Sequence, residues 1–93
     1  MINIGDVIDI FFRGTNFKGI VISNLGTSQY EVIYESLDMA NFRRYIKNIV
    51  YWSTDGWTLV NPSVEIANRE IYKDFIERLK WNLYKNFYYY YFF

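Results

Sequence analysis

The sequence contains no cysteine and no histidine. The absence of cysteine excludes disulfides, zinc–thiolate sites and thiol nucleophiles. The absence of histidine removes the commonest general base, the commonest transition-metal ligand and the usual pH switch near neutrality. Catalytic arrangements of the Ser-His-Asp or Cys-His type are therefore excluded.

Paired carboxylates and phosphate-binding glycine loops are also missing. Asp6 and Asp9 stand three positions apart in a predicted strand, so their side chains leave opposite faces. No Asp-x-Asp or similar metal-nuclease spacing occurs, and none of the five glycines lies in a loop that opens a helix. The sequence therefore predicts a protein that is not an enzyme, with no catalytic residues, no metal site and no cofactor.

The chain has no excess of either charge. Ten Lys and Arg residues balance ten Asp and Glu residues, so the formal net charge is zero. A protein that coats nucleic acid usually carries a basic excess, because neutralised phosphates supply most of its affinity. A net charge of zero instead removes self-repulsion and favours self-association.

Long apolar runs are absent as well. Asp6 and Asp9 interrupt the apolar N-terminal stretch, and no run approaches the roughly 18 residues of a membrane span. The N-terminus also lacks the basic region and cleavage site of a signal peptide. We therefore expect no membrane span and a cytoplasmic location, which would be the host cytoplasm for a viral protein.

Aromatic residues, by contrast, are abundant. They make up 23% of the 93 residues, and hydrophobic residues make up 52%. This composition predicts one domain, residues 1–93, with a core of its own. Residue types with AT-rich codons (Phe, Tyr, Met, Ile, Asn and Lys) form about half of the chain. That bias favours an origin in low-GC bacteria or in their phages and other mobile elements.

About five short strands are predicted within residues 1–61. VIDIFFR and SQYEVIYE show period-two alternation, FKGIVIS reads as the strand that returns after a turn at residues 14–16, and IVYWS and WTLV are β-branched and aromatic. Gly19 inside the second run indicates a bulge or a close backbone contact, and Asp55–Gly56 predicts a tight hairpin between the last two runs. Residues 36–48 fit either a short helical turn or a long loop.

The apolar period then lengthens to three or four residues, which is typical of a helix. Asn61 suits the N-cap and Pro62 the first helical position. The apolar stripe that follows consists of Val64, Ala67, Ile71, Phe75, Leu79 and Leu83. We expect an amphipathic helix over residues 62–86 and an aromatic tail over residues 87–93, packed on the domain or on a partner.

The opening GDVI strand, the successive short hairpins and the late DGW hairpin resemble the SH3-like small barrels, a class that includes Tudor and KOW modules. The resemblance covers residues 4–61. Residues 36–48 are longer than the usual connection, and the C-terminal helix is an addition. The predicted fold class is α+β: a bent antiparallel sheet or SH3-like barrel of about five strands, then one amphipathic helix and the tail.

Two groups of side chains within residues 42–57 are candidate partner-binding sites. The first group combines cations and aromatic rings. It is either a site that binds phosphates, carboxylates or bases, or a solvated face whose positive charges balance nearby carboxylates. It consists of Arg43, Arg44, Lys47, Phe42 and Tyr45. The other is Trp52 and Trp57, which bracket the Asp-Gly turn as an aromatic groove or as a pair that closes the hairpin.

The tail is the third candidate, with Tyr88, Tyr90 and Phe92 as partner-binding residues. Seven exposed rings would exceed the apolar patch that soluble monomers show, so something must cover them. Three covers are open. The tail folds back over the barrel or the helix, with a last strand as one form of this; a second copy or a foreign protein covers it; or it meets a membrane interface.

The resulting functional hypothesis is a non-enzymatic binding module. It would be a small phage or mobile-element protein that binds and inhibits or modulates a host protein through an aromatic-rich surface. One alternative is a nucleic-acid or nucleotide binder that uses the basic and aromatic cluster. The other is a structural homo-oligomer, such as a homodimer.

Overall fold

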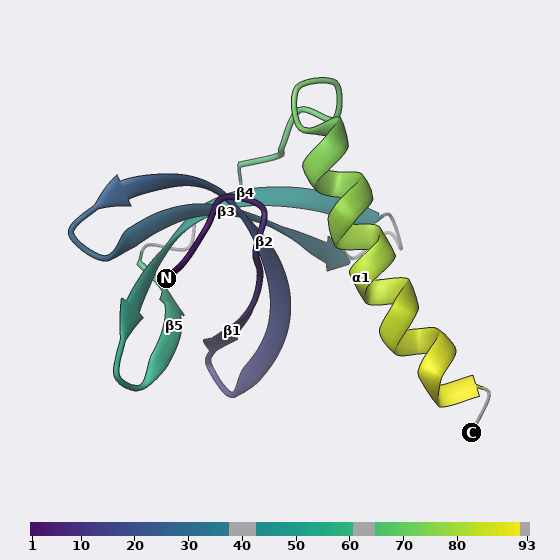
Figure 1. The fold of residues 1–93 in the computed structure, drawn as a ribbon, viewed down its shortest axis with the longest axis horizontal. Helices are drawn as coiled ribbons and strands as arrows, with labels where there is room; N and C mark the ends of the chain where they lie inside the picture. The colour runs from purple at the N-terminus through teal and green to yellow at the C-terminus, as the bar shows by residue number, and fades with distance from the viewer. Residues whose placement is uncertain (38–42, 61–64, 92–93) are drawn as a thin grey trace.

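Five strands and one helix follow one another along the chain (Figure 1). The computed structural model describes residues 1–37, 43–60 and 65–91, with the backbone alone described at residues 37, 43 and 86–91. The elements are β1 (Val7–Phe12), β2 (Thr15–Gly26), β3 (Gln29–Leu37), β4 (Arg43–Ser53), β5 (Gly56–Leu59) and α1 (Lys73–Tyr91). The predicted α+β order, strands first and a helix last, is confirmed.

The strands close into a barrel. Each strand pairs antiparallel with the next, and β5 closes the barrel by pairing parallel with β1, where Trp57 lies beside Ile10. The Asp-Gly hairpin is confirmed, since Ser53 pairs with Gly56 across the turn and Gly56 has a φ of 109°. A closed five-strand barrel followed by a helix agrees with the SH3-like resemblance.

The interior of the barrel is apolar. Its buried side chains are Ile8, Ile10, Val21, Val32, Val50 and Trp57. Gly19 on β2 lies against this interior, because a Cβ atom there would be 2.7 Å from Ile10 Cδ1 and 3.3 Å from the carbonyl oxygen of Ile33. The close contact predicted at Gly19 is therefore confirmed, and any larger residue would have to displace the core.

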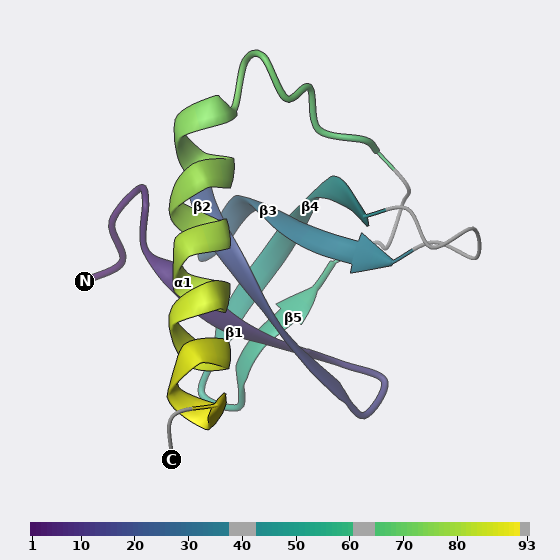
Figure 2. The ribbon, with the colours of Figure 1, turned by 90° about the vertical axis from the view of Figure 1, so that its right-hand side faces the viewer.

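A second apolar cluster lies outside the barrel, beneath α1. It contains Ile20, Ile22, Ile33, Tyr45, Ala67, Ile76 and Leu79. Figure 2 shows α1 running across the outside of the barrel. Since β2 is covered on both faces, residues 19–22 are all buried. This double cover explains why FKGIVIS reads as an almost continuous apolar run.

The prediction of a helical turn or a long loop over residues 36–48 is wrong at both ends of that stretch. Ser36 lies in β3, and residues 43–48 lie in β4. The two strands remain paired as far as Leu37 and Arg43. Residues 38–42 lie outside the described part of the chain. Pairing with β3 is a tertiary constraint that overrides the weak helical spacing of this stretch.

The helix begins later than the predicted residue 62. Ile66 forms an antiparallel bridge with Ile46, and the amide of Ala67 donates to the carbonyl oxygen of Tyr45 at 2.7 Å. The side-chain oxygen of Asn68 then accepts from the amide of Glu70 at 2.9 Å, as an N-cap residue does. Residues 65–67 are therefore held by β4, while Asn61 and Pro62 lie outside the described residues.

The helix also ends later than predicted. Its backbone continues through Tyr91, so residues 87–91 extend α1 by more than a turn. The expectation that the tail folds back as a last strand is wrong for these residues. Tyrosine and phenylalanine have only modestly lower helix propensity than leucine, so an established helix can propagate through them. Across the described residues, no helix is both long and apolar enough to cross a membrane.

Candidate functional site

The two halves of α1 have different surroundings. In the first half, Ile76 and Leu79 are buried against the outer face of β2 and β3. Among the described side chains of α1, Leu83 is the last that packs on this cluster. Beyond it the helix diverges from the strands, and Figure 1 shows its C-terminal half projecting from the barrel. The barrel therefore covers one side of the helix and only part of its length.

The projecting half is rich in rings. Residues 81–91, here called the aromatic end of α1, contain seven aromatic residues and one charged residue, Lys85. With 3.6 residues per turn, seven rings in eleven positions must occupy every side of the helix. A helix that is apolar on all sides is normally buried. The aromatic end of α1 is therefore the candidate site.

Two described side chains display this surface directly. Trp81 is 71% exposed, and Tyr84 is 48% exposed. Trp81 follows the fully buried Leu79 by two positions, which places it about 200° around the helix from the barrel. These two rings are the centre of the candidate site. The apolar periodicity of the sequence did not identify Trp81 and Tyr84 as site residues. That pattern predicts which face of the helix is buried, but it does not predict what the opposite face contacts.

Two of the tail residues predicted as partner-binding, Tyr88 and Tyr90, lie on this element. Positions 81 and 88 are seven residues apart, two turns of the same helix, so these positions share one face of the helical backbone. Positions 83 and 90 are separated by the same interval and share another face. Phe92 lies outside the described residues.

The basic and aromatic cluster does not assemble as one patch. Arg44 and Tyr45 are neighbours on β4, so they face opposite sides of the sheet. Arg44 is exposed, whereas Tyr45 is buried beneath α1. Phe42, and the side chain of Arg43, lie outside the described residues.

The ammonium group of Lys47 contacts two carboxylates of its own chain. Its ammonium lies 2.9 Å from a carboxylate oxygen of Glu65 and 3.9 Å from one of Glu31. It also lies 5.8 Å from the ring centre of Tyr72. The hydrogen bond to Glu65 raises the pKa of Lys47 above its ordinary value. This lysine stabilises the domain and is poorly placed to meet a phosphate.

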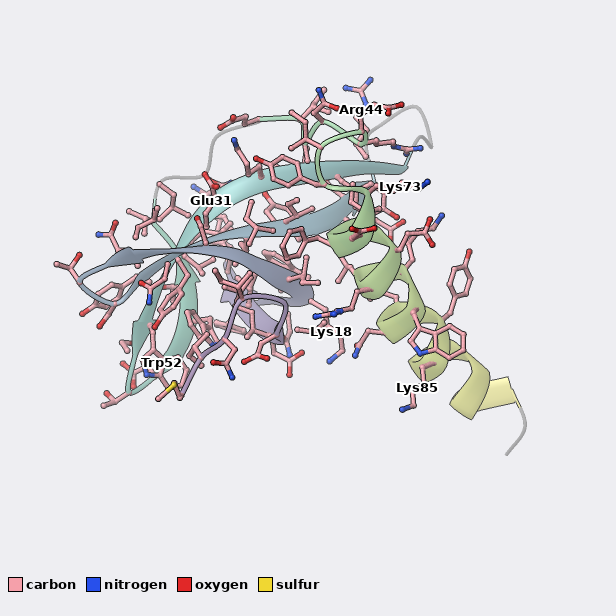
Figure 3. All side chains as sticks on the ribbon, turned by 45° about the horizontal axis from the view of Figure 1, so that its top comes forward. Lys18, Glu31, Arg44, Trp52, Lys73 and Lys85 are labelled. Carbon is pink, nitrogen blue, oxygen red and sulfur yellow. The ribbon has the colours of Figure 1, made fainter. Side chains whose placement is uncertain are left out.

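The two tryptophans of the last hairpin also differ. Trp57 is buried in the barrel interior, with the ring of Tyr30 packed edge-on at 5.2 Å. Trp52 lies directly across the hairpin, with its ring centre 4.9 Å from that of Trp57. It is 44% exposed, and Figure 3 shows it on the barrel, far from α1. The pair closes the hairpin, and only Trp52 is accessible to a partner.

A cleft of about 280 Å³ opens between β4 and the first half of α1. It is lined by Tyr45, Arg69, Glu70, Lys73, Ile76, Glu77 and Lys80. Arg69 lies over the ring of Tyr45, 5.5 Å from its centre. Three cations alternate with two carboxylates, so the cleft has no strong field of one sign. Sequence reasoning missed it because Tyr45 and Arg69 are 24 positions apart.

Within the described residues, no cluster of three or more Asp or Glu side chains is arranged to hold a metal ion. Comparison of the chain with family models, with curated proteins and with solved structures finds no match.

Proposed function

We propose that this chain is a non-enzymatic protein-binding module and that the aromatic end of α1 is its partner-binding surface. The observation that carries the proposal is the exposure of Trp81, at 71%, on the side of α1 that faces away from the barrel. Interface cores are enriched in tryptophan and tyrosine, and such residues dominate binding energies. A projecting helix rich in these residues is suited to pack against another protein.

The charges support a protein partner over a nucleic acid. Lys47 is paired with Glu65, and the cations of the cleft alternate with Glu70 and Glu77. The aromatic end itself contains only one charged residue, Lys85. Nucleic acid requires several cations that can reach phosphates together. Protein recognition through rings requires few charges, and its affinity should depend little on salt.

Two kinds of protein suit such a surface. The AT-rich codon bias favours a phage or mobile-element protein, and a host protein that it inhibits or modulates is then the foreign partner to test. The other candidate is a second copy of the chain. Both would bury the same rings, and both predict that the rings, and not the basic residues, determine affinity.

The test compares bait proteins in a nuclease-treated lysate of a low-GC bacterium. Trp81→Lys should abolish retention of any partner that wild type retains through the aromatic end, and raised salt should change wild-type retention little. Trp52→Gln is the matched control, because it removes an exposed tryptophan from the barrel instead of the helix. Partner retention that survives Trp81→Lys but is lost in high salt would reject the proposal in favour of an electrostatic binder.

A further inference from the structure

We infer that the partner at the aromatic end of α1 is a second copy of this chain, bound by antiparallel pairing of the two α1 helices about Trp81. The inference rests on the proposed function and identifies the occupant of the same surface. It is argued from the free face of the helix, from the positions of charges along that face and from the area available.

The face of α1 that would form the contact is exposed from Glu77 to Lys85. Glu77, Trp81 and Lys85 are spaced four residues apart, so they form one row along the helix. All three are exposed, whereas Leu79 on the opposite side is fully buried. Figure 2 shows no other element of the chain in front of α1 on this side, and Figure 3 shows Lys85 on the projecting half. A second helix can therefore approach without meeting the barrel.

The charges on this row complement themselves. Glu77 and Lys85 each stand four residues from Trp81, one on either side. In an antiparallel pair with its two-fold axis at Trp81, Glu77 of each copy lies opposite Lys85 of the other, and the two indoles meet at the centre. Parallel pairing would instead oppose like charges. Among the described residues, neither Glu77 nor Lys85 forms an ion pair within its own chain.

This symmetry favours a copy over a foreign protein. A C2 interface requires that one patch be complementary to itself, so that residue i meets residue j and j meets i. A surface for a foreign partner has no reason to place opposite charges at equal distances on either side of its central ring. The net charge of zero also means that two copies do not repel each other.

The exposed rings on this face add apolar area to the contact. Trp81 is 71% exposed and Tyr84 is 48% exposed, so a second copy would cover the part of each ring that its own chain leaves open. An aromatic side chain buries about 150–250 Å² when fully covered, so these two rings would supply roughly 200–300 Å² of the roughly 800 Å² per partner of a standard interface.

The test is sedimentation equilibrium of the full chain over a roughly hundredfold concentration range. Wild type should pass from monomer to dimer. Glu77→Lys and Lys85→Glu should each raise the dissociation constant by about tenfold, because each converts two attractive pairs into two repulsive ones. The double variant should restore wild-type affinity to within about threefold, since the opposite charges are exchanged but still paired.

Lys80→Glu is the matched control. It reverses an exposed charge on the same helix, at a position about 100° around the helix from Trp81 and outside the row of Glu77, Trp81 and Lys85. It should dimerise like wild type. Circular dichroism of each variant confirms that the helix is intact. A dimer in which Lys85→Glu behaves like Lys80→Glu, or in which the double variant fails to recover, would overturn antiparallel pairing about Trp81.

The remaining outcomes separate this inference from the proposed function. A wild-type chain that stays monomeric at every concentration overturns the dimer. If Trp81→Lys then still abolishes retention of a lysate protein, the aromatic end remains a protein-binding surface with a foreign occupant. If the monomer instead sediments with phosphatidylcholine vesicles and Trp81→Lys releases it, lipid covers the rings and both proposals are rejected.

Discussion

Lys47 and Glu65 form an ion pair with 2.9 Å between Nζ and Oε1, and it fastens the segment before α1 to β4. The backbone joins the same two residues, because the amide of Lys47 donates to the carbonyl oxygen of Glu65 at 2.7 Å. This attachment fixes the path of the chain from the barrel to the helix. Ile76 and Leu79, buried residues of α1, then determine which face of the helix meets the barrel.

Glu65→Gln is expected to lower the free energy of unfolding by about 0.5 kcal/mol near neutral pH, because Glu65 is largely exposed and its pair is screened. The hydrogen bond to Glu65 raises the folded-state pKa of Lys47 above its ordinary value of 10.5. The stabilisation by this ion pair is therefore fully present below pH 10.5, and it is lost as the pH rises through the folded-state pKa of Lys47. Urea unfolding measures the free energy of unfolding of wild type and of Glu65→Gln, once near neutral pH and once above pH 10.5. The difference in free energy between the two proteins should be smaller at the higher pH. Glu70→Gln, which removes a carboxylate that Lys47 does not contact, is the control.

Leu79→Ala is expected to destabilise the domain by about 2–5 kcal/mol, because it empties a fully buried site between α1 and the barrel. Lys80→Ala, at the next and exposed position, should change the free energy of unfolding by less than about 0.5 kcal/mol. Chemical denaturation of both variants provides the comparison. Equal effects would mean that α1 contributes nothing to the core.

Gly19→Ala is expected to destabilise by about 1–3 kcal/mol, since the new Cβ would lie 2.7 Å from Ile10 Cδ1 in a packed interior. Ile10→Val removes that methyl group and costs about 0.5–1.5 kcal/mol alone. The double variant should be less destabilised than the sum of the single variants. Simple additivity in a double-mutant cycle would show that the two residues do not meet.

Trp57→Ala should cost about 3–5 kcal/mol, because this indole fills the barrel interior. Trp52→Ala removes only the exposed ring of the cross-strand pair and should cost about 1 kcal/mol. Thermal unfolding followed by circular dichroism distinguishes the two. A larger loss for Trp52→Ala would contradict the assignment of Trp57 to the core.

Local patterns account for the elements that the sequence predicted correctly. The alternation in VIDIFFR and SQYEVIYE reflects strands with unlike faces, and Asp55–Gly56 reflects a turn that needs a positive φ. Each of these signals lies within a few residues. The helix start was misplaced because residues 65–67 carry helical spacing but form hydrogen bonds with β4, about twenty positions earlier.

The candidate site was predictable only in its composition. The seven terminal rings indicated that something must cover them, and periodicity indicated an amphipathic helix. Neither signal showed that residues 87–91 continue α1 or that the helix leaves the barrel beyond Leu83. The path of α1 relative to the barrel depends on packing between segments far apart in the chain, which local periodicity does not report.

By itself, the sequence determined the order of the elements, the small barrel, the surplus of aromatic residues and the balance of charge. These properties follow from composition and from periods of two or about four residues, which act over short distances. Only the tertiary structure decided that Lys47 is neutralised by Glu65, that Trp57 is core while Trp52 is surface, and that Trp81 faces away from the barrel. Each of these depends on contacts, or on their absence, between segments far apart in the chain, and local patterns carry no information about such contacts.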